Sequence, residues 1–247
     1  MGESKLDLFT YAEHTELENC KSLLCVQAHP RELELAAGGT IAKLVKKGCK
    51  VFFLTVTDGS KGTPDASLSP LKLMEIRRQE AVAAGKLLGV TEQLFFDYTD
   101  GDCPPTVELC RGILAVIRAL RPQMVLSMDP YRPYEFHPDR LAVAMSAAQA
   151  VFLSAAPHYH KDVGEAHSVE SIVFHTTNSA NVFVNIEETL QQKLDAIFLH
   201  TSQTHGEEDL RFYIDYLSRM HARKCGCEHS EAFFQLPSQL MSLHFQA

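Results

Sequence analysis

Apolar and polar positions follow two different periods along the chain, and the change between them predicts the order of the secondary structure. Short, continuous apolar runs are typical of strands covered on both faces of a parallel sheet, and they occupy 22–27, 50–57, 93–96 and 123–128. Helical spacing of apolar residues predicts helices between these runs, over 38–47, 71–88 and 106–120. This alternation favours a Rossmann-like, doubly wound α/β fold, with a mostly parallel sheet and helices on both faces.

The pattern becomes less regular after residue 137. We expect a helix from there to about 153, strands near 171–174 and 182–186, a helix over 187–200 and a less regular tail. A chain of 247 residues with 45% apolar content suits one sizeable core better than two. The expected organisation is an N-terminal extension over 1–21 and a single α/β domain over 22–247.

Charge and cysteine content narrow the partners that we expect for this chain. Acidic residues outnumber basic ones by 31 to 23, so the basic surface needed for nucleic acid or an anionic membrane is missing. No apolar run is long enough to span a bilayer, and the acidic first twenty residues do not resemble a secretory signal. Seven scattered cysteines favour reduced thiols. We therefore expect a cytoplasmic protein with a small-molecule ligand, and neither nucleic acid nor membrane as a partner.

Two polar segments follow the first and fourth predicted strands. In a sheet of order 3-2-1-4-5 these strands are neighbours where the winding reverses, and ligands bind at their carboxyl ends. A lone His-Pro pair is more often without function, but two such pairs at adjacent strand ends indicate a site. The side chains that this topology places around one cleft are His29, Arg31, Glu32, His137, Asp139 and Arg140.

The same two segments resemble the motifs of a known family. LmbE/PIG-L proteins carry Ala-His-Pro-Asp-Asp-x-Glu after the first strand and His-Pro-Asp-His after the fourth. This chain matches the first motif at Ala28, His29, Pro30 and Glu34, and the second at His137, Pro138 and Asp139. Further matches occur in the family's order at Gly38-Gly39-Thr40, Thr57-Asp58-Gly59, Arg77 with Glu80, Arg121-Pro122, His200-Thr201-Ser202-Gln203 and Ser230-Glu231. Together they make the chain similar to the zinc-dependent N-deacetylases of this family from about residue 22 to 235.

The resemblance implies a hydrolase that removes acetyl groups from N-acetylglucosamine-type amino sugars, as in glycosylphosphatidylinositol, mycothiol and bacillithiol pathways. In the family, zinc is held at the positions of His29, Glu32 and Arg140, which leaves one coordination site for water. The general base stands at the position of Arg31. The position of His137, with Asp139 in the same motif, serves to stabilise the oxyanion or to protonate the leaving amine.

The resemblance also implies residues that bind substrate. Arg77 borders the substrate pocket in the family, although its spacing from Glu80 on one helix face favours an ion pair between the two. We expect Asp58 at the mouth of the cleft and Tyr131 in the proline-rich loop before the second motif, where turn packing is the alternative. The expected substrate is an acetylated amino sugar or an anionic sugar derivative. A homo-oligomer stays open, because family members often assemble through their carboxyl-terminal region.

Arg31 and Arg140 depart from the family pattern. A guanidinium has no acceptor and does not deprotonate, so Arg140 cannot bind a cation and Arg31 cannot take a proton from water. Two arginines and Glu32 sum to a charge of +1, which zinc would raise to +3. We therefore expect zinc to bind weakly or not at all. The two arginines then either pair with carboxylates, Arg140 with Glu32 and Arg31 with Asp139, or form a site for an anion such as phosphate.

Three functions therefore stay open. The first is N-deacetylation of an amino sugar, which the motifs support and the two arginines oppose. The second is a metal-free, non-catalytic homologue that binds a sugar or an anion, and the third is a hydratase or lyase variant of the superfamily. A separate group, Cys225-Gly226-Cys227-Glu228-His229, brings two thiols and an imidazole together in a spacing that is not that of a standard zinc finger.

Overall fold

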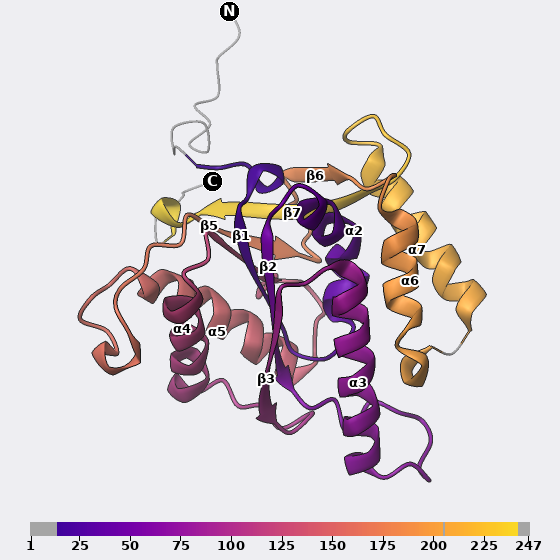
Figure 1. Cartoon of the computed structure of the whole chain (residues 1–247), viewed down its shortest axis with the longest axis horizontal. Helices are drawn as coiled ribbons and strands as arrows, with labels where there is room; N and C mark the ends of the chain where they lie inside the picture. Colours follow the sequence, from indigo (N-terminus) through magenta and orange to yellow (C-terminus); the bar gives the residue numbers. More distant parts are fainter. Residues whose placement is uncertain (1–13, 205, 242–247) are drawn as a thin grey trace, which may run out of the picture.

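The computed structural model describes residues 14–204 and 206–241. Its centre is a seven-stranded sheet in the order β3-β2-β1-β4-β5-β7-β6 (Figure 1). The strands are β1 (Ser22–Gln27), β2 (Lys50–Thr57), β3 (Glu92–Tyr98), β4 (Met124–Met128), β5 (Ser171–His175), β6 (Val182–Asn185) and β7 (Ser230–Pro237). The helices are α2 (Glu32–Lys46), α3 (Pro70–Leu88), α4 (Val107–Leu120), α5 (Pro138–Ser154), α6 (Leu190–Phe198) and α7 (Glu207–Ala222). Short 3-10 turns are η1 (Leu17–Asn19), η2 (Lys161–Val163), η3 (Thr201–Gln203) and η4 (Ser238–Leu240).

The first five strands run parallel, and β7 pairs antiparallel with both β5 and β6. The predicted doubly wound fold and the order 3-2-1-4-5 are therefore confirmed. The winding reverses between β1 and β4, so the segments that follow these two strands leave the sheet side by side.

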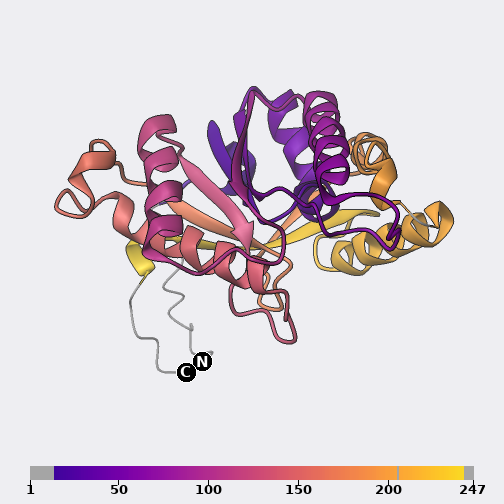
Figure 2. The same cartoon turned by 90° about the horizontal axis from the view of Figure 1, so that it is seen from below.

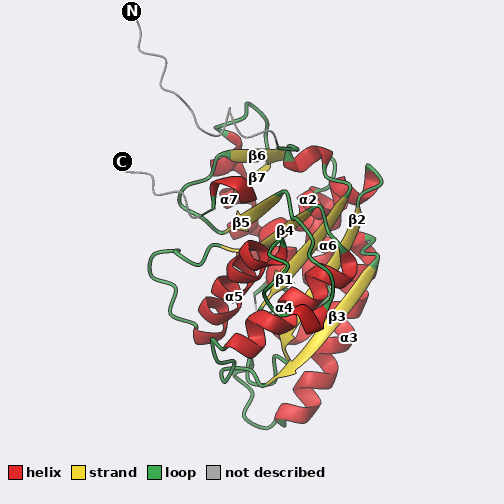
Figure 3. Cartoon of the chain, turned by 90° about the vertical axis from the view of Figure 1, so that its left-hand side faces the viewer, coloured by secondary structure: helices red, strands yellow, loops and turns green. Residues whose placement is uncertain are grey.

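Helices cover the two faces of the sheet in separate groups (Figures 2 and 3). Alternate residues of β1 point to opposite faces: Leu23 packs with α2, α3 and α6, and Leu24 packs with α4 and α5. Gly39 on α2 is required by this packing, because a Cβ there would lie 2.8 Å from Ile186. Among the described residues, no helix is both long and apolar enough to cross a membrane.

Local signals explain the start of α3 and α4 and the end of α3. Ser69 and Thr106 accept hydrogen bonds from the first turns of α3 and α4, and Gly89 ends α3 in a left-handed conformation with φ of 81°. The expectation for α2 was wrong at its start: the helix begins at Glu32 rather than at residue 38. The earlier start puts the acidic residues of the first motif in the first helical turn, where the helix dipole favours them.

The carboxyl-terminal region is more regular than the sequence indicated, since the expected tail contains α7 and β7. Aromatic residues such as Phe212 and Tyr216 lie on the exposed side of α7, so its sequence does not show one clear apolar face. Buried Glu231 and Gln235 interrupt the apolar pattern of β7. At the other end, Leu17 of η1 is fully buried against the domain, so residues 14–21 pack onto it; the rest of the expected extension, 1–13, lies outside the described residues.

Candidate functional site

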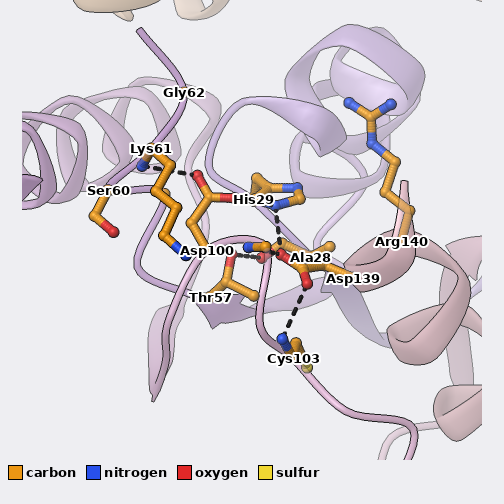
Figure 4. Close-up of polar contacts among 12 residues, drawn as sticks. Ala28, His29, Thr57, Ser60, Lys61, Gly62, Asp100, Cys103, Asp139 and Arg140 are labelled. Carbon is orange, nitrogen blue, oxygen red and sulfur yellow. Dashed lines mark hydrogen bonds and ion pairs between the residues drawn. The ribbon is translucent and has the colours of Figure 1, made fainter. Parts of the chain in front are cut away.

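The segments that follow β1 and β4 meet, as the winding of the sheet predicted. His29 lies directly after β1 and Asp139 in the first turn of α5, and His29 Nε2 is 3.0 Å from Asp139 Oδ2 (Figure 4). Asp139 is fully buried, and its carboxylate also accepts hydrogen bonds from the backbone N–H groups of Gly101 and Cys103, at 2.6 and 3.0 Å. One carboxylate thus joins the ends of β1, β3 and α5.

A third segment, the loop after β3, contributes Asp100, which the sequence analysis missed. Its Oδ1 lies 3.0 Å from His29 Nε2, and its Oδ2 accepts a hydrogen bond from the backbone N–H of Lys61 at 3.1 Å (Figure 4). The available signal was its position: Asp100 ends the polar turn after the third parallel strand, at the same sheet edge as the two motifs.

The electrostatics of this group centre on His29. Burial disfavours its charged form, but hydrogen bonds and charge interactions with Asp100 and Glu32 outweigh burial and raise the pKa of His29 to about 10. Against the opposing effect of burial, the same imidazolium and Arg77 lower the pKa of Asp100 to about 2. His29 and Arg140 likewise hold the pKa of Glu32 well below its usual value, although burial opposes them. The mutual contacts of His29, Asp100 and Glu32 therefore favour the charged form of each.

Arg140 pairs with Glu32, which confirms this one of the two carboxylate pairings expected from the sequence. Arg140 Nε lies 2.6 Å from Glu32 Oε1, and Arg140 Nη1 lies 3.4 Å from Glu135 Oε2. The same Oε1 of Glu32 lies 2.9 Å from His29 Nδ1, and Oε2 accepts from the backbone N–H groups of Ala28 and His29. Both carboxylate oxygens of Glu32 are thus engaged by groups of this chain.

Arg31 does not pair with Asp139, so that expectation was wrong. Arg31 precedes α2 in a left-handed conformation with φ of 84°, and its Nη1 donates to the carbonyl oxygen of Gln203 at 2.7 Å. The acceptor oxygens of Asp139 are already occupied by His29 and two backbone N–H groups. Arg31 therefore links the start of α2 to η3.

Arg77 and Glu80 do not pair with each other either. The buried Arg77 donates to the carbonyl oxygens of Gly59 and Pro30 at 2.7 and 3.2 Å, and its Nη1 lies 3.8 Å from Asp100 Oδ2. Glu80 accepts hydrogen bonds from Thr201 and Ser202 of η3. Arg77 thereby ties the cleft loops to α3, and Glu80 ties η3 to the same helix.

The remaining predicted site residues are Asp58, Tyr131 and His137. Asp58 Oδ1 accepts hydrogen bonds from the backbone N–H groups of Ser60 and Asp100, so its carboxylate shapes the turn that carries Lys61. Tyr131 is 79% exposed in the loop before α5. His137 packs edge-on against His29, with ring centroids 4.5 Å apart. Of these, His137 lies in the cleft itself.

The family model described as GlcNAc-PI de-N-acetylase matches residues 24–151, which contain both motifs and most of the residues above. The chain belongs to the PIG-L family. This confirms the resemblance that the motifs indicated.

Relatives of this PIG-L chain include several deacetylases of amino sugars. Diacetylchitobiose deacetylase of Thermococcus kodakarensis is 35% identical over 204 residues, which cover 81% of this chain and 75% of the relative. An enzyme of Nocardioides, 1D-myo-inositol 2-acetamido-2-deoxy-alpha-D-glucopyranoside deacetylase, is 31% identical, and the match covers 61% of this chain and 60% of that one. The structure of N,N'-diacetylchitobiose deacetylase from Pyrococcus horikoshii superposes with a TM-score of 0.87 at 29% identity, and covers 92% of this chain and 88% of that chain.

The three positions that the motif resemblance assigns to zinc are occupied by His29, Glu32 and Arg140. Glu32 and His29 are hydrogen-bonded to each other, and the third position carries a guanidinium. A different set of donors lies beside it: ligand atoms of His29, Asp100, His137 and Asp139 are all within 4.8 Å of one another, a spacing that one metal ion can bridge. These four residues are thus a possible metal-binding group, which shares His29 with the motif positions and contains neither Glu32 nor Arg140.

Proposed function

We propose that this chain is an N-deacetylase scaffold for an acetylated amino sugar, in which the family metal position binds zinc weakly or not at all. Two relatives support the substrate class: a diacetylchitobiose deacetylase that is 35% identical over 81% of this chain, and a deacetylase of an inositol-linked acetamido sugar that is 31% identical over 61% of it. The ion pair between Glu32 and Arg140 carries the second part of the proposal. Hydrolysis is consequently expected to be slow.

Charge explains why this ion pair opposes zinc. Two unit charges 4 Å apart interact by about 4 kcal/mol at a moderate effective dielectric, and a divalent ion doubles that figure to about 8 kcal/mol. An ion at the family position would meet the Arg140 guanidinium at this range and would have to separate Glu32 from both Arg140 and His29. The guanidinium supplies no ligand in return, because it cannot coordinate a cation.

The cleft keeps groups that can hold an acetamide. The Nδ1 atom of His137 is buried and has no hydrogen-bond partner among the residues that the structure describes, and this unused hydrogen-bonding capacity supports a role for His137 toward a substrate. The carboxylate of Asp100 lies beside His29 and is held by the backbone N–H of Lys61, so it supports the orientation of the imidazole (Figure 4). These residues support binding and orientation of an amino sugar whether or not a metal is present.

The decisive experiment pairs metal analysis with an acetate-release assay on N,N'-diacetylchitobiose. The native chain and the variant with Arg31→Asp and Arg140→His are dialysed with zinc and then against a weak chelator. We expect well under one zinc per native chain, with gain of zinc and of turnover in the variant. A matched control, Arg211→Asp with Arg219→His, makes the same substitutions in exposed ion pairs on α7 and is expected to change neither quantity.

Three outcomes separate the alternatives. One tightly held zinc in the native chain contradicts weak binding, and Asp100→Asn against Glu32→Gln then shows which donor set holds it. If the native chain binds the sugar, and neither it nor the variant with Arg31→Asp and Arg140→His releases acetate, the non-catalytic homologue is favoured. Conversion of an unsaturated acid by the native chain, with no acetate release from any amino sugar, favours the hydratase or lyase variant.

The structure gives less support to an anion site. Arg31 is directed to the carbonyl oxygen of Gln203, and Arg140 is shared between two carboxylates. A phosphate would therefore have to replace existing partners rather than enter a prepared pocket. An anionic sugar derivative stays a less favoured substrate for this reason.

A further inference from the structure

Two cysteines lie in contact on the loop between α7 and β7, the yellow loop at the upper right of Figure 1. The Sγ atoms of Cys225 and Cys227 are 3.0 Å apart, and Cys225 is exposed whereas Cys227 is half-buried. The other five cysteines are buried in the core or under its edges. Among the cysteines that the structure describes, Cys225 and Cys227 are therefore the two whose thiols external reagents can reach.

The nearby imidazole does not join the two thiols. His229 Nδ1 is hydrogen-bonded to Ser218 Oγ at 2.9 Å, and its Nε2 faces Asp215 Oδ1 at 3.8 Å. Its backbone carbonyl, not its ring, contacts Cys227 Sγ. A zinc site needs three or four protein ligands, whereas this loop directs two sulfur atoms toward one point. The geometry favours chemistry between the two sulfurs over a metal site.

The backbone of the loop holds the pair in place. Gly226 has φ of 70°, a conformation that favours glycine, and a Cβ there would meet nothing within 4 Å. The N–H groups of Cys225 and Gly226 both donate to the carbonyl oxygen of Ala222 at the end of α7. The turn around Gly226 thus folds the two cysteine side chains back onto each other.

The two thiols have different environments. Burial, and then the hydrogen bond and like charge of Cys225, raise the pKa of Cys227 to about 11. The protonated form of Cys227 is therefore favoured while Cys225 lies beside it. Cys225 is the more exposed of the two, so it is the sulfur that an external reagent meets first.

We propose that Cys225 and Cys227 form a redox-active dithiol that exchanges with small-molecule disulfides of the glutathione type. The thiolate of Cys225 attacks one sulfur of the external disulfide, forms a mixed disulfide and releases one thiolate. Cys227 then loses its proton to solvent and attacks Cys225 Sγ, which closes the intramolecular disulfide and releases the second thiolate. Two protein thiols are oxidised and one external disulfide is reduced to two thiols, so atoms and electrons balance.

Ring size determines how such a pair behaves. A disulfide across a single intervening residue closes a small, exposed ring, and exposed or strained disulfides are the ones that thiols reduce readily. The pair is accordingly expected to cycle with the thiol–disulfide ratio of its surroundings rather than to act as a permanent cross-link. The proposal is independent of the hydrolytic function, because these cysteines lie outside the cleft residues described above.

The test equilibrates the full chain, with chelator present, in mixtures of reduced and oxidised glutathione. Samples are quenched in acid, alkylated and digested, and the peptide that carries both cysteines is measured by mass spectrometry. We expect that peptide to lose two hydrogens as the mixture becomes oxidising and to regain them when it becomes reducing. Cys227→Ser is expected to accumulate a stable mixed disulfide at Cys225, and Cys225→Ser to form one at Cys227 at least about tenfold more slowly, because that thiol is less exposed.

A second variant separates ring closure from thiol reactivity. Gly226→Val keeps both cysteines but opposes the left-handed turn, so we expect the closed disulfide to be disfavoured several-fold while the mixed disulfide still forms. The proposal is overturned if the native peptide stays reduced while buried cysteines oxidise, or if it stops at the mixed disulfide. Equal closure in Gly226→Val would show that the turn does not position the pair. Protection from oxidation by one equivalent of zinc in chelator-free buffer would assign the pair to a metal instead.

Discussion

Individual side chains decide what the cleft of this protein can do. Glu32 is shared by His29, Arg140 and two backbone N–H groups, so a change at residue 140 alters the partners of a residue in the other motif. Asp139 likewise links several segments, because its carboxylate contacts His29 and accepts hydrogen bonds from two backbone N–H groups of the loop after β3. The cleft therefore couples stability to chemistry through these two carboxylates.

Asp139→Asn is expected to destabilise the fold markedly. The substitution removes a buried negative charge and replaces one acceptor oxygen with an NH2 group. That group cannot accept a hydrogen bond, so the backbone N–H of Gly101 or of Cys103 loses its acceptor at a fully buried position. The expected loss in the free energy of unfolding is about 3 kcal/mol, measured by urea titration. The matched control is Asp102→Asn, whose exposed ion pair with Lys61 should contribute less than about 0.5 kcal/mol. Equal effects of the two variants would contradict the role given to Asp139.

His175, at the end of β5, makes the stability depend on pH. Burial, aided by the charges of Arg132 and Arg140 and opposed by Glu32, lowers the pKa of His175 from 6.5 to about 4. Since the unfolded chain takes up this proton at a higher pH than the native chain, the native state loses stability as pH falls from 6.5 toward 4. We expect His175→Asn to abolish roughly 3 kcal/mol of the stability difference between pH 7 and pH 4.

The measurement for His175 is urea unfolding at both pH values, with chelator present. His158→Asn is the control, because His158 is exposed and its removal should leave the pH dependence unchanged. A native chain and a His175→Asn variant with the same pH dependence would show that this imidazole is protonated equally in both states.

At the scale of elements, the strand–helix alternation was sufficient to predict the parallel part of the sheet. The runs that became β1, β2 and β4 are apolar on both faces, and this signal has few alternatives. The antiparallel edge was not predictable in the same way. Gln235 and Glu231 on β7 are buried because they bind backbone and side-chain partners far away in sequence, and a sequence pattern does not show such partners.

The candidate site was likewise predictable only in part. Topology brought His29, Glu32 and Asp139 together, since each follows a strand next to the reversal point. Asp100 was missed because the loop after β3 bends back to the cleft through hydrogen bonds with Asp58 and Lys61. The direction of Arg31 depends on η3, which comes about 170 residues later by sequence count. Long-range polar contacts, rather than periodicity, set these positions.

The contact between α6 and β7 provides an element-scale prediction. Lys193 Nζ lies 2.6 Å from Glu231 Oε1, both residues are buried, and Glu231 also accepts from the backbone N–H groups of Gly39 and Thr40 on α2. We expect Glu231→Leu to cost about 3–5 kcal/mol, because it leaves an ammonium and two N–H groups without an acceptor. Lys193→Met should cost less, since the carboxylate keeps both backbone donors.

Urea unfolding of the two single variants and the double variant measures this coupling. The exposed pair between Arg219 and Asp215 on α7 is the control, with an expected coupling of about 0.5 kcal/mol or less. If Lys193→Met proved as costly as Glu231→Leu, the ammonium rather than the backbone donors would dominate the contact.

At the scale of the whole molecule, one sheet separates two apolar clusters. Leu23 and Cys25 of β1 lie in the cluster with α2 and α3, and Leu24 lies in the cluster with α4 and α5. Both clusters are therefore built on the same central strand, so displacement of β1 disrupts both of them. This arrangement predicts that the two sides of the molecule unfold together.

Leu23→Ala and Leu24→Ala test this cooperativity from opposite faces. Each removes a fully buried side chain and should cost about 2–5 kcal/mol. Cys25 reports on one cluster and Cys110 on the other, so thiol labelling at increasing urea, read by mass spectrometry, follows both faces in one sample. We expect either variant to lower the urea midpoint at both cysteines equally, because the shared strand couples the two clusters. A Leu23→Ala variant that exposed Cys25 well before Cys110 would instead show two independently unfolding halves.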